Sequence, residues 1–202
     1  MDEAEKNFPK WETLYEDVKV ETMPWFHPAL DPDLERSLAE LGIVCGSFLD
    51  IGTGPATQAI ALAKMGFRVT ATDISGAAIK RGRGLAKEMG LHIDFRRDDI
   101  LATSLMGPFD FVFDRGCFHT LSPGYRDPYL RVVSRLVQGG GYLFLKCFSH
   151  EEPMEDGPYR FSPEEIRTIF SGTFDTGRIE NTVYQGTLDP LPRALFCVLK
   201  KR

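Results

Sequence analysis

The sequence lacks the features that mark several large classes of protein. No apolar run reaches the ~18 residues that cross a bilayer, and the polar, acidic N-terminus is unlike a secretory signal. The four cysteines form no CxxC pair, so neither a zinc site nor a disulfide framework is expected. With a net charge of −5, the chain lacks the basic face that nucleic acid requires. These absences predict a cytoplasmic protein that binds neither nucleic acid nor a membrane, and they leave its oligomeric state open.

Strand and helix signals alternate along the chain, which favours an α/β fold with a mostly parallel sheet and helices on both faces. The expected strands cover 47–51, 68–72, 93–96, 109–114, 142–147, 179–184 and 194–199. The segment between the last two is too short for a crossover helix, so these strands are expected to form an antiparallel hairpin. With 202 residues, the chain is long enough for one such domain, expected over 31–202 after an aromatic arm over 1–30.

A glycine-rich turn follows the first expected strand. Gly52 and Gly54 stand where a turn needs a positive φ, or where a backbone must approach a ligand closely. Asp73 ends the second strand, at the offset where a βαβ unit presents a carboxylate to a ribose hydroxyl. This unit is therefore expected to bind a nucleoside.

Two departures from the dinucleotide fingerprint indicate which nucleoside. Ala56 stands near the place of the third glycine, and Asp50 puts a carboxylate where it would repel a pyrophosphate. A carboxylate can instead pair with the ammonium and sulfonium groups of S-adenosylmethionine (SAM). The stretch resembles the first motif of class I SAM-dependent methyltransferases, hydrophobic-(Asp/Glu)-x-Gly-x-Gly-x-Gly, with Ala56 at the third glycine. The resemblance implies a Rossmann-like seven-stranded sheet of order 3-2-1-4-5-7-6 with the last strand antiparallel.

Ligands of open α/β sheets lie beyond the carboxyl ends of the strands, so the residues after each strand are candidate cofactor contacts. An adenine amino group can be accepted by Asp98 or Asp99 while Ile100 packs against the ring. The resemblance favours Asp99, because Asp98 takes the place of a family glycine; the alternative is a turn with two solvated acids. The residues expected to contact SAM are Trp25, Asp50, Gly52, Thr53, Gly54, Asp73, Ile74, Asp98, Asp99, Ile100 and Asp114.

The segment after the fourth strand, Asp114 to Arg126, faces the methyl group in this fold. It lacks the (Asn/Asp)-Pro-Pro-(Tyr/Phe) box of many amino-group methyltransferases. It resembles instead the thiopurine S-methyltransferase and tellurite-resistance methyltransferase group, through its Asp-Arg-Gly and its Arg126-x-x-Tyr129. The N-terminal Trp-x-x-x-Tyr and Pro-Trp resemble the arms of that group. The resemblance implies methyl transfer to a small molecule, with a thiol or related soft atom as the leading choice and S-adenosylhomocysteine (SAH) as the product.

His119 and Arg115 are the candidate catalytic residues. The unperturbed pKa of histidine, near 6.5, suits removal of a proton from a thiol or acid, although His119 can equally begin a helix and bond a backbone carbonyl. Arg115 can bind an anionic substrate or pair with a neighbouring acid. No metal site is expected, because Lys146 and Cys147 stand where catechol-type methyltransferases place the remaining Mg²⁺ ligands.

Other functions stay open at this point. A protein or small-amine N-methyltransferase would share all the cofactor motifs, and a non-catalytic SAM-binding module would keep them without turnover. A dehydrogenase is disfavoured by Ala56 and Asp50. The arm, with Trp25 the foremost candidate for a ligand contact, is expected to fold over the cofactor and substrate as a lid. The alternative is that its rings permanently plug an apolar surface.

Overall fold

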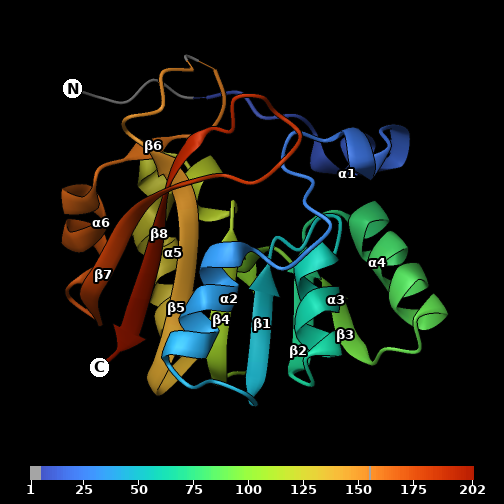
Figure 1. The fold of residues 1–202 in the computed structure, drawn as a ribbon, viewed down its shortest axis with the longest axis horizontal. Coiled ribbons are helices and arrows are strands. Elements are labelled where there is room, and N and C mark those ends of the chain that lie inside the picture. The colour runs from blue at the N-terminus through green and yellow to red at the C-terminus, as the bar shows by residue number, and fades with distance from the viewer. Residues whose placement is uncertain (1–5, 155) are drawn as a thin grey trace.

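The computed structural model describes residues 6–154 and 156–202, built around one mixed β-sheet (Figure 1). The order of its strands is β3-β2-β1-β4-β5-β8-β7, and β8 runs antiparallel to both of its neighbours while the other pairs along this path are parallel. The strands are β1 (Ser47–Ile51), β2 (Arg68–Asp73), β3 (Ile93–Arg97), β4 (Phe109–Arg115), β5 (Val137–Ser149), β6 (Arg160–Phe161), β7 (Phe174–Val183) and β8 (Arg193–Lys201).

The expected topology is confirmed. The observed order becomes 3-2-1-4-5-7-6 when β6, a two-residue strand that pairs with the end of β5 and that the sequence did not reveal, is left out of the numbering. The hairpin of β7 and β8 is also present. β7 begins at Phe174 instead of Ile179, because a register shift between Asp175 and Arg178 interrupts its pairing without ending it.

Six α-helices flank this sheet in the described ranges. They are α1 (Trp11–Asp17), α2 (Pro32–Glu40), α3 (Thr57–Lys64), α4 (Gly76–Glu88), α5 (Pro123–Leu136) and α6 (Pro163–Phe170), with three 3₁₀ turns, η1 (Val20–Thr22), η2 (Ile100–Ala102) and η3 (Phe118–Thr120). Local chemistry sets their starts: the Ser75 hydroxyl accepts the Ala78 N–H at α4, and Ser162 and Glu165 form a reciprocal capping box at α6. Within the same ranges, no helix combines the length and apolarity needed to cross a membrane.

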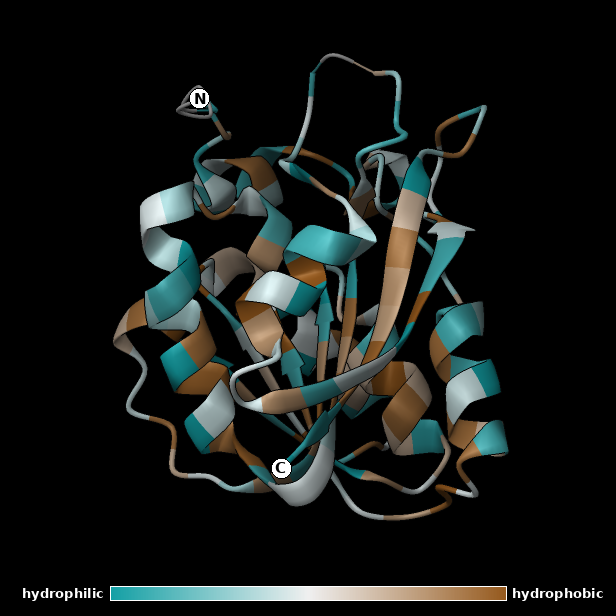
Figure 2. Cartoon of the chain, turned by 90° about the vertical axis from the view of Figure 1, so that its left-hand side faces the viewer, coloured by the Kyte–Doolittle hydropathy of each residue, from teal (hydrophilic) through white to brown (hydrophobic). Residues whose placement is uncertain are grey.

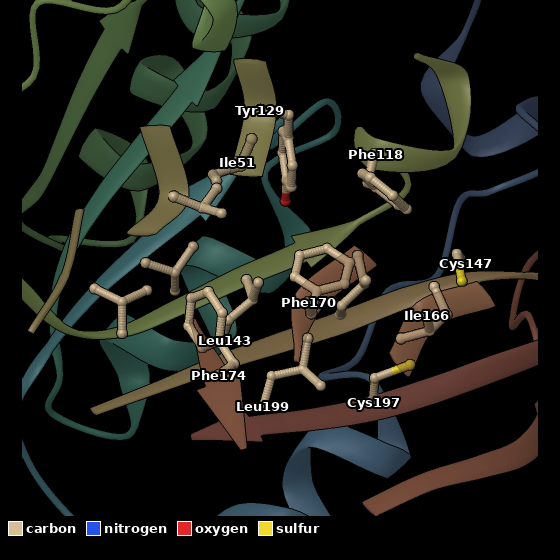
Figure 3. Close-up of a cluster of buried hydrophobic side chains, with 14 of the residues drawn as sticks. Ile51, Phe118, Tyr129, Leu143, Cys147, Ile166, Phe170, Phe174, Cys197 and Leu199 are labelled. Atoms are coloured by element: carbon tan, nitrogen blue, oxygen red, sulfur yellow. The ribbon is translucent and has the colours of Figure 1, made fainter. Parts of the chain in front are cut away.

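Alternation along the strands divides the core between the two faces of the sheet. Phe48, Phe113 and Phe144 point to the face covered by α2, α3 and α4. Their chain neighbours Leu49 and Val112 point to the face covered by α5 and α6. Figure 3 shows part of this second cluster, in which Leu143, Ile166, Phe170, Phe174 and Leu199 gather between strands and helices. The hydrophobic residues accordingly concentrate on the strands and on the sides of the helices that face them (Figure 2).

Helix α4 packs unusually close to the glycine turn. A Cβ atom at Gly82 would lie 2.6 Å from the ring of Phe95 on β3 and 3.0 Å from the Cβ of Ala56. A glycine inside a helix costs about 1 kcal/mol relative to alanine, so this position keeps glycine for the contact it permits. The middle of α4 and the turn after β1 are thereby held against each other.

Candidate active site

A cavity of about 540 Å³ lies beyond the carboxyl ends of the parallel strands. Its volume is in the range of small-molecule sites, roughly 300–1,000 Å³. The residues that follow β1, β2, β3 and β4 form its floor, and the N-terminal arm and the connections after β5 and β7 cover it. The expected site residues that line it are Trp25, Gly52, Asp73, Ile74, Asp98, Asp99, Ile100, Arg115 and His119, whereas Asp50, Thr53, Gly54 and Asp114 do not.

The turn after β1 has a left-handed backbone at three positions. The φ angle is +64° at Gly52, +47° at Gly54 and +63° at Ala56, so Ala56 adopts the backbone that the family's third glycine would supply. Gly52 lines the cavity, and a Cβ on it would lie 3.2 Å from the Cβ of Cys117. Gly54 is covered from above, since a Cβ there would overlap the hydroxyl of Tyr15. The arm, and not open cavity, therefore lies against Gly54.

Asp73 ends β2 and faces the cavity. Its carboxylate accepts the N–H groups of Gly54 and Ser75, both at 2.8 Å, and so links the glycine turn to the start of α4. Burial raises the pKa of Asp73, and these two bonds oppose the rise. An ionised carboxylate offers about four acceptor positions, so Asp73 can still accept the hydroxyl groups of a ribose.

Asp98 and Asp99 follow β3 and differ in what their oxygens accept. The carboxylate of Asp99 accepts the N–H of Leu101 at 3.0 Å and caps η2. Asp98 carries a buried Oδ2 that has no hydrogen-bond partner in the described part of the chain, and the residue lines the cavity. A buried oxygen without a donor is costly, so a ligand donor is the simplest partner for it. The geometry thus favours Asp98, where the sequence favoured Asp99; Ile74 and Ile100 supply apolar wall beside them.

Asp50 and Asp114 lie beneath the floor of the cavity, contrary to expectation. Asp50 is buried and accepts the Thr53 hydroxyl at 2.6 Å, which also turns Thr53 away from a ligand. Asp114 is buried and accepts the Tyr129 hydroxyl at 2.6 Å and backbone N–H groups of residues 116–118. Burial raises the pKa of Asp50 to about 7 and that of Asp114 to about 6. Each carboxylate shapes the loop after its strand, and a direct ion pair with a ligand would need an exposure that neither has.

Arg115, at the end of β4, belongs to a buried ion network. Its guanidinium pairs with Asp31 at 3.0 Å and donates to the backbone carbonyls of Trp25 and Gln185. The guanidinium also lies over the ring of Tyr184, 4.6 Å from its centroid. Arg115 therefore fastens the arm and the connection after β7 to the end of the sheet, and three of its five N–H groups are already used.

The fully buried Lys146 on β5 completes this network. Its ammonium pairs with Asp31 and with Asp33, each at 2.8 Å, and donates to the side-chain oxygen of Gln185 at 2.5 Å. Burial by itself would raise the pKa of Asp31, but the charges of Lys146 and Arg115 hold it below its usual value. Removing one member of a buried ion pair costs about 3–5 kcal/mol, so this network holds the arm and the connection after β7 in place over the cavity.

His119, in η3, lines the cavity as a neutral ring. The N–H of Phe148 donates to its Nδ1 at 3.2 Å, which leaves the ring proton on Nε2. Burial lowers the pKa of His119 to about 3. The ring stacks on Tyr184, with 5.6 Å between centroids. Since the nitrogen left for a ligand already carries a proton, His119 is placed to donate a hydrogen bond, which disfavours the general-base role that its residue type suggested.

The arm closes the cavity from the side of α4. The carboxylate of Glu12 in α1 accepts the N–H of Gly76 at 2.6 Å, which anchors α1 at the start of α4. Trp25 lines the cavity, and its indole N–H donates to the hydroxyl of Tyr15 at 3.2 Å. In Figure 1 the arm passes above the carboxyl ends of the strands. The first five residues of the arm expected over 1–30 lie outside the described residues.

Two further segments meet the arm above the sheet. The N–H of Thr187, in the connection after β7, donates to the carbonyl of Pro24 at 3.0 Å. At the other end of the arm, the Lys6 ammonium donates to the carbonyls of Gly157 and Pro158, at 2.7 and 3.0 Å. The cavity is therefore covered by three stretches that are far apart in the sequence: the arm, the segment around residues 157–158 and the connection after β7.

The comparisons with known proteins agree with this fold and cavity. Residues 48–141 match a family model described as a methyltransferase domain. An uncharacterized methyltransferase of Schizosaccharomyces pombe is 32% identical over 114 residues, which are 56% of this chain and 79% of that protein. The chain therefore belongs to the methyltransferase family.

Solved structures place it within that family's fold. A structure from work on the conversion of a disulfide bond into a thioacetal group during echinomycin biosynthesis aligns with a TM-score of 0.81 at 24% identity, over 95% of this chain and 90% of the other. TehB of Haemophilus influenzae aligns with a TM-score of 0.73 at 16% identity, over 86% of this chain and 63% of the other. Others with this fold hold SAM or SAH. The protein is a SAM-dependent methyltransferase.

The residues of the cavity suit this cofactor. Asp73 and Asp98 present acceptor oxygens, as ribose hydroxyls and an adenine amino group require, and Ile100 offers an apolar surface to a ring. Gly52 brings the backbone to the cavity wall without a side chain. Among residues 6–154 and 156–202, no group of three His, Cys, Asp or Glu side chains is arranged to hold a metal ion.

Proposed function

We propose that the protein methylates a soft nucleophile, a thiol or related sulfur atom, of a small molecule held in this cavity. When bound, SAM supplies an electrophilic methyl group on a sulfonium. The wall that continues beyond Gly52 toward β5 is largely apolar and includes Trp25, Phe148, Met154 and Tyr184. Such a wall suits an acceptor with an apolar body and a polarisable reacting atom. The protein's part is then alignment and exclusion of water, which strengthens the attraction between an electron-rich sulfur and a sulfonium.

The observation that carries this proposal is the burial of the titratable groups at that wall. His119 keeps its proton on Nε2, and burial raises the pKa of the Cys117 thiol and of the Tyr184 hydroxyl above their usual values. These groups therefore offer no base at neutral pH. A free thiol, with a pKa of about 8.5, is already partly ionised at neutral pH, whereas an alkyl amine, with a pKa of about 10, must first lose a proton. A wall without a base favours the thiol, which can lose its proton to solvent before it binds.

The membership in the thiopurine and tellurite-resistance group is part of the same proposal. Two of its sequence features meet in space, because the Tyr129 hydroxyl of Arg126-x-x-Tyr129 bonds the carboxylate of Asp114 in Asp-Arg-Gly. The guanidinium of Arg126 lies 4.6 Å from the centroid of the Phe161 ring, beneath the same loop. These residues support the loop that carries Cys117 and His119, which accounts for their co-occurrence without a direct role in chemistry.

The test is turnover with labelled SAM on matched acceptors: benzyl mercaptan, benzylamine and benzyl alcohol. We expect methylation of the mercaptan at a rate at least about tenfold above that of the amine, and a rate that follows ionisation of the mercaptan as the pH rises. Faster methylation of the amine would establish the N-methyltransferase alternative. Binding of SAH without turnover on any acceptor would favour a non-catalytic SAM-binding module.

A variant of His119 tests whether its side chain acts as a hydrogen-bond donor or as a general base. Glutamine can place an N–H near the position of Nε2 but cannot take up a proton. If His119 only donates a hydrogen bond, the rate of His119→Gln should stay within about tenfold of the original, whereas loss of a general base costs ~10²–10⁴-fold. His119→Leu, which removes the donor as well, is the matched control and should be slower than the glutamine variant.

A further inference from the structure

Tyr15 of the arm occupies a position that the methyl transfer described above does not explain. Its side chain is 5% exposed, lines the cavity, and lies with its hydroxyl against Gly54 in the glycine turn. The guanidinium of Arg81 on α4 donates to its backbone carbonyl at 3.5 Å. A residue of the arm is thus held at the edge of the turn that the family uses for its cofactor.

The hydroxyl of Tyr15 has an unused proton. Its oxygen accepts the indole N–H of Trp25 at 3.2 Å, and within the part of the chain that the structure describes the hydroxyl donates no hydrogen bond of its own. Burial, together with the nearby charge of Asp73, raises the pKa of Tyr15, so the hydroxyl stays protonated. An oxygen that accepts one hydrogen bond becomes a better donor of another. The arrangement presents a polarised O–H to the cavity.

The polar groups of the cavity are divided in a way that matches the two ends of the cofactor. Asp73 and Asp98 present acceptors, which suit the hydroxyl and amino groups of a nucleoside. Two donors also line the cavity, the Tyr15 hydroxyl beside the glycine turn and the Arg115 guanidinium at the end of β4. Trp25 connects them: its N–H donates to Tyr15 and its carbonyl accepts from Arg115. A carboxylate requires donors, and the amino-acid end of SAM carries one.

We propose that the Tyr15 hydroxyl binds the carboxylate of SAM, so that the arm recognises the amino-acid end of the cofactor while the strand ends recognise its nucleoside. This inference rests on the cofactor and is independent of the proposed acceptor. It makes Tyr15 a binding residue, and it makes closure of the arm depend on a carboxylate in the cavity.

The test compares two ligands that share the nucleoside. SAH carries the amino-acid end, and methylthioadenosine lacks it. Calorimetry with Tyr15→Phe, which keeps the ring and removes the hydroxyl, should show SAH binding about tenfold weaker and methylthioadenosine binding within about twofold of the original. Tyr142→Phe, a change of the same kind at a residue of β5 that does not line the cavity, should alter neither affinity. Equal weakening of both ligands, or no weakening of SAH, would overturn the proposal.

Two other variants approach the same contact if Tyr15→Phe is poorly folded. Trp25→Phe removes the N–H that polarises the hydroxyl, and Gly54→Ala places a Cβ where the hydroxyl now lies. Both should weaken SAH more than methylthioadenosine. Hydrogen exchange of residues 8–30 in the original protein adds a readout of closure: SAH should increase protection more than methylthioadenosine does, and equal protection would contradict a carboxylate-dependent arm. None of these measurements includes an acceptor, so failure of the thiol proposal would leave their outcome unchanged.

Discussion

Four aspartates lie at or just after the carboxyl ends of the first four strands, at the same edge of the sheet, yet they divide into two pairs. Asp73 and Asp98 line the cavity, and Asp98 keeps an oxygen without a partner. Asp50 and Asp114 lie below the floor, where hydroxyl groups from the chain itself donate to them at 2.6 Å. Position at a strand end is common to all four, so it does not decide which of them meets a ligand.

The difference lies in whether the chain covers the carboxylate. Asp50 and Asp114 are buried outside the cavity lining, where Thr53 bonds Asp50, and Tyr129 and backbone N–H groups at 116–118 bond Asp114. Asp73 also bonds the chain, through the N–H groups of Gly54 and Ser75, but it lines the cavity and keeps acceptor positions open toward it. A carboxylate at such an edge serves the fold where the chain covers it, and remains available to a ligand where it lines the cavity.

The largest effect should come from Asp73. Replacement by alanine removes a charged acceptor for the ribose and should weaken SAH binding by about 2–3 kcal/mol. It also leaves the N–H groups of Gly54 and Ser75 without an acceptor, so thermal unfolding must be measured alongside. Asp73→Asn, which keeps one acceptor oxygen, is the matched control and should lose less affinity. Unchanged SAH affinity in the alanine variant would mean that Asp73, like Asp50 and Asp114, does not contact the cofactor.

Replacement of Asp98 should weaken SAH binding less than replacement of Asp73 and more than replacement of Asp99. Asp98→Asn should weaken SAH by about 1–2 kcal/mol, because the carboxylate that we expect to accept the adenine amino group loses its charge. Asp99→Asn should change it by less than about 0.5 kcal/mol, since that residue caps η2 at the exposed edge.

A ligand change tests the same assignment. S-inosylhomocysteine carries a carbonyl in place of the amino group, so the original protein should bind it more weakly than SAH. An asparagine at position 98 can turn its N–H₂ group toward that carbonyl, and should narrow the difference. If Asp99→Asn, and not Asp98→Asn, loses the preference for SAH, the contact with the adenine amino group belongs to Asp99, as the resemblance favoured.

The features that the sequence predicted correctly come from local signals or from the family resemblance. The strands and the glycine turn follow from residues that are close in the chain, whereas the strand order is what the resemblance implied. Ala56, which the motif marked only as a departure at the third glycine, has a glycine-like φ of +63° in the structure. The placement of Asp73 and Ile100 at the cavity follows from the ends of their strands.

The features that the sequence missed depend on partners far along the chain. Lys146 pairs with Asp31 across more than a hundred residues, and nothing in the spacing of either residue indicates the other. Asp50 resembled a ligand-binding acid because its neighbour Thr53 gave no sign of turning toward it. The short strand β6 has too few residues for a recognisable pattern, and the contact of Tyr15 with Gly54 depends on the path of the whole arm.

The smallest effect on the cofactor, and a distinct effect on stability, should come from Asp50. Burial raises its pKa from 3.8 to about 7, so between these values the folded protein holds a proton that the unfolded chain releases. The stability that this proton contributes is complete below pH 3.8 and is lost as the pH rises through 7. Asp50→Asn removes this dependence and can still accept the Thr53 hydroxyl. Relative to the original protein, its free energy of unfolding should therefore increase between pH 5 and pH 8, as chemical denaturation at each pH would measure.

Asp50→Asn also tests the difference between the two pairs of aspartates. Because Asp50 lies below the floor, Asp50→Asn should bind SAH within about twofold of the original at a pH where both are folded, in contrast to Asp73→Ala. Asp127→Asn, which removes a charge from the exposed side of α5, is the control and should leave both the pH dependence and the affinity unchanged. A loss of SAH affinity in Asp50→Asn as large as that in Asp73→Ala would mean that Asp50 pairs with the cofactor after all. An unchanged pH dependence would mean that its carboxyl is already ionised within the fold.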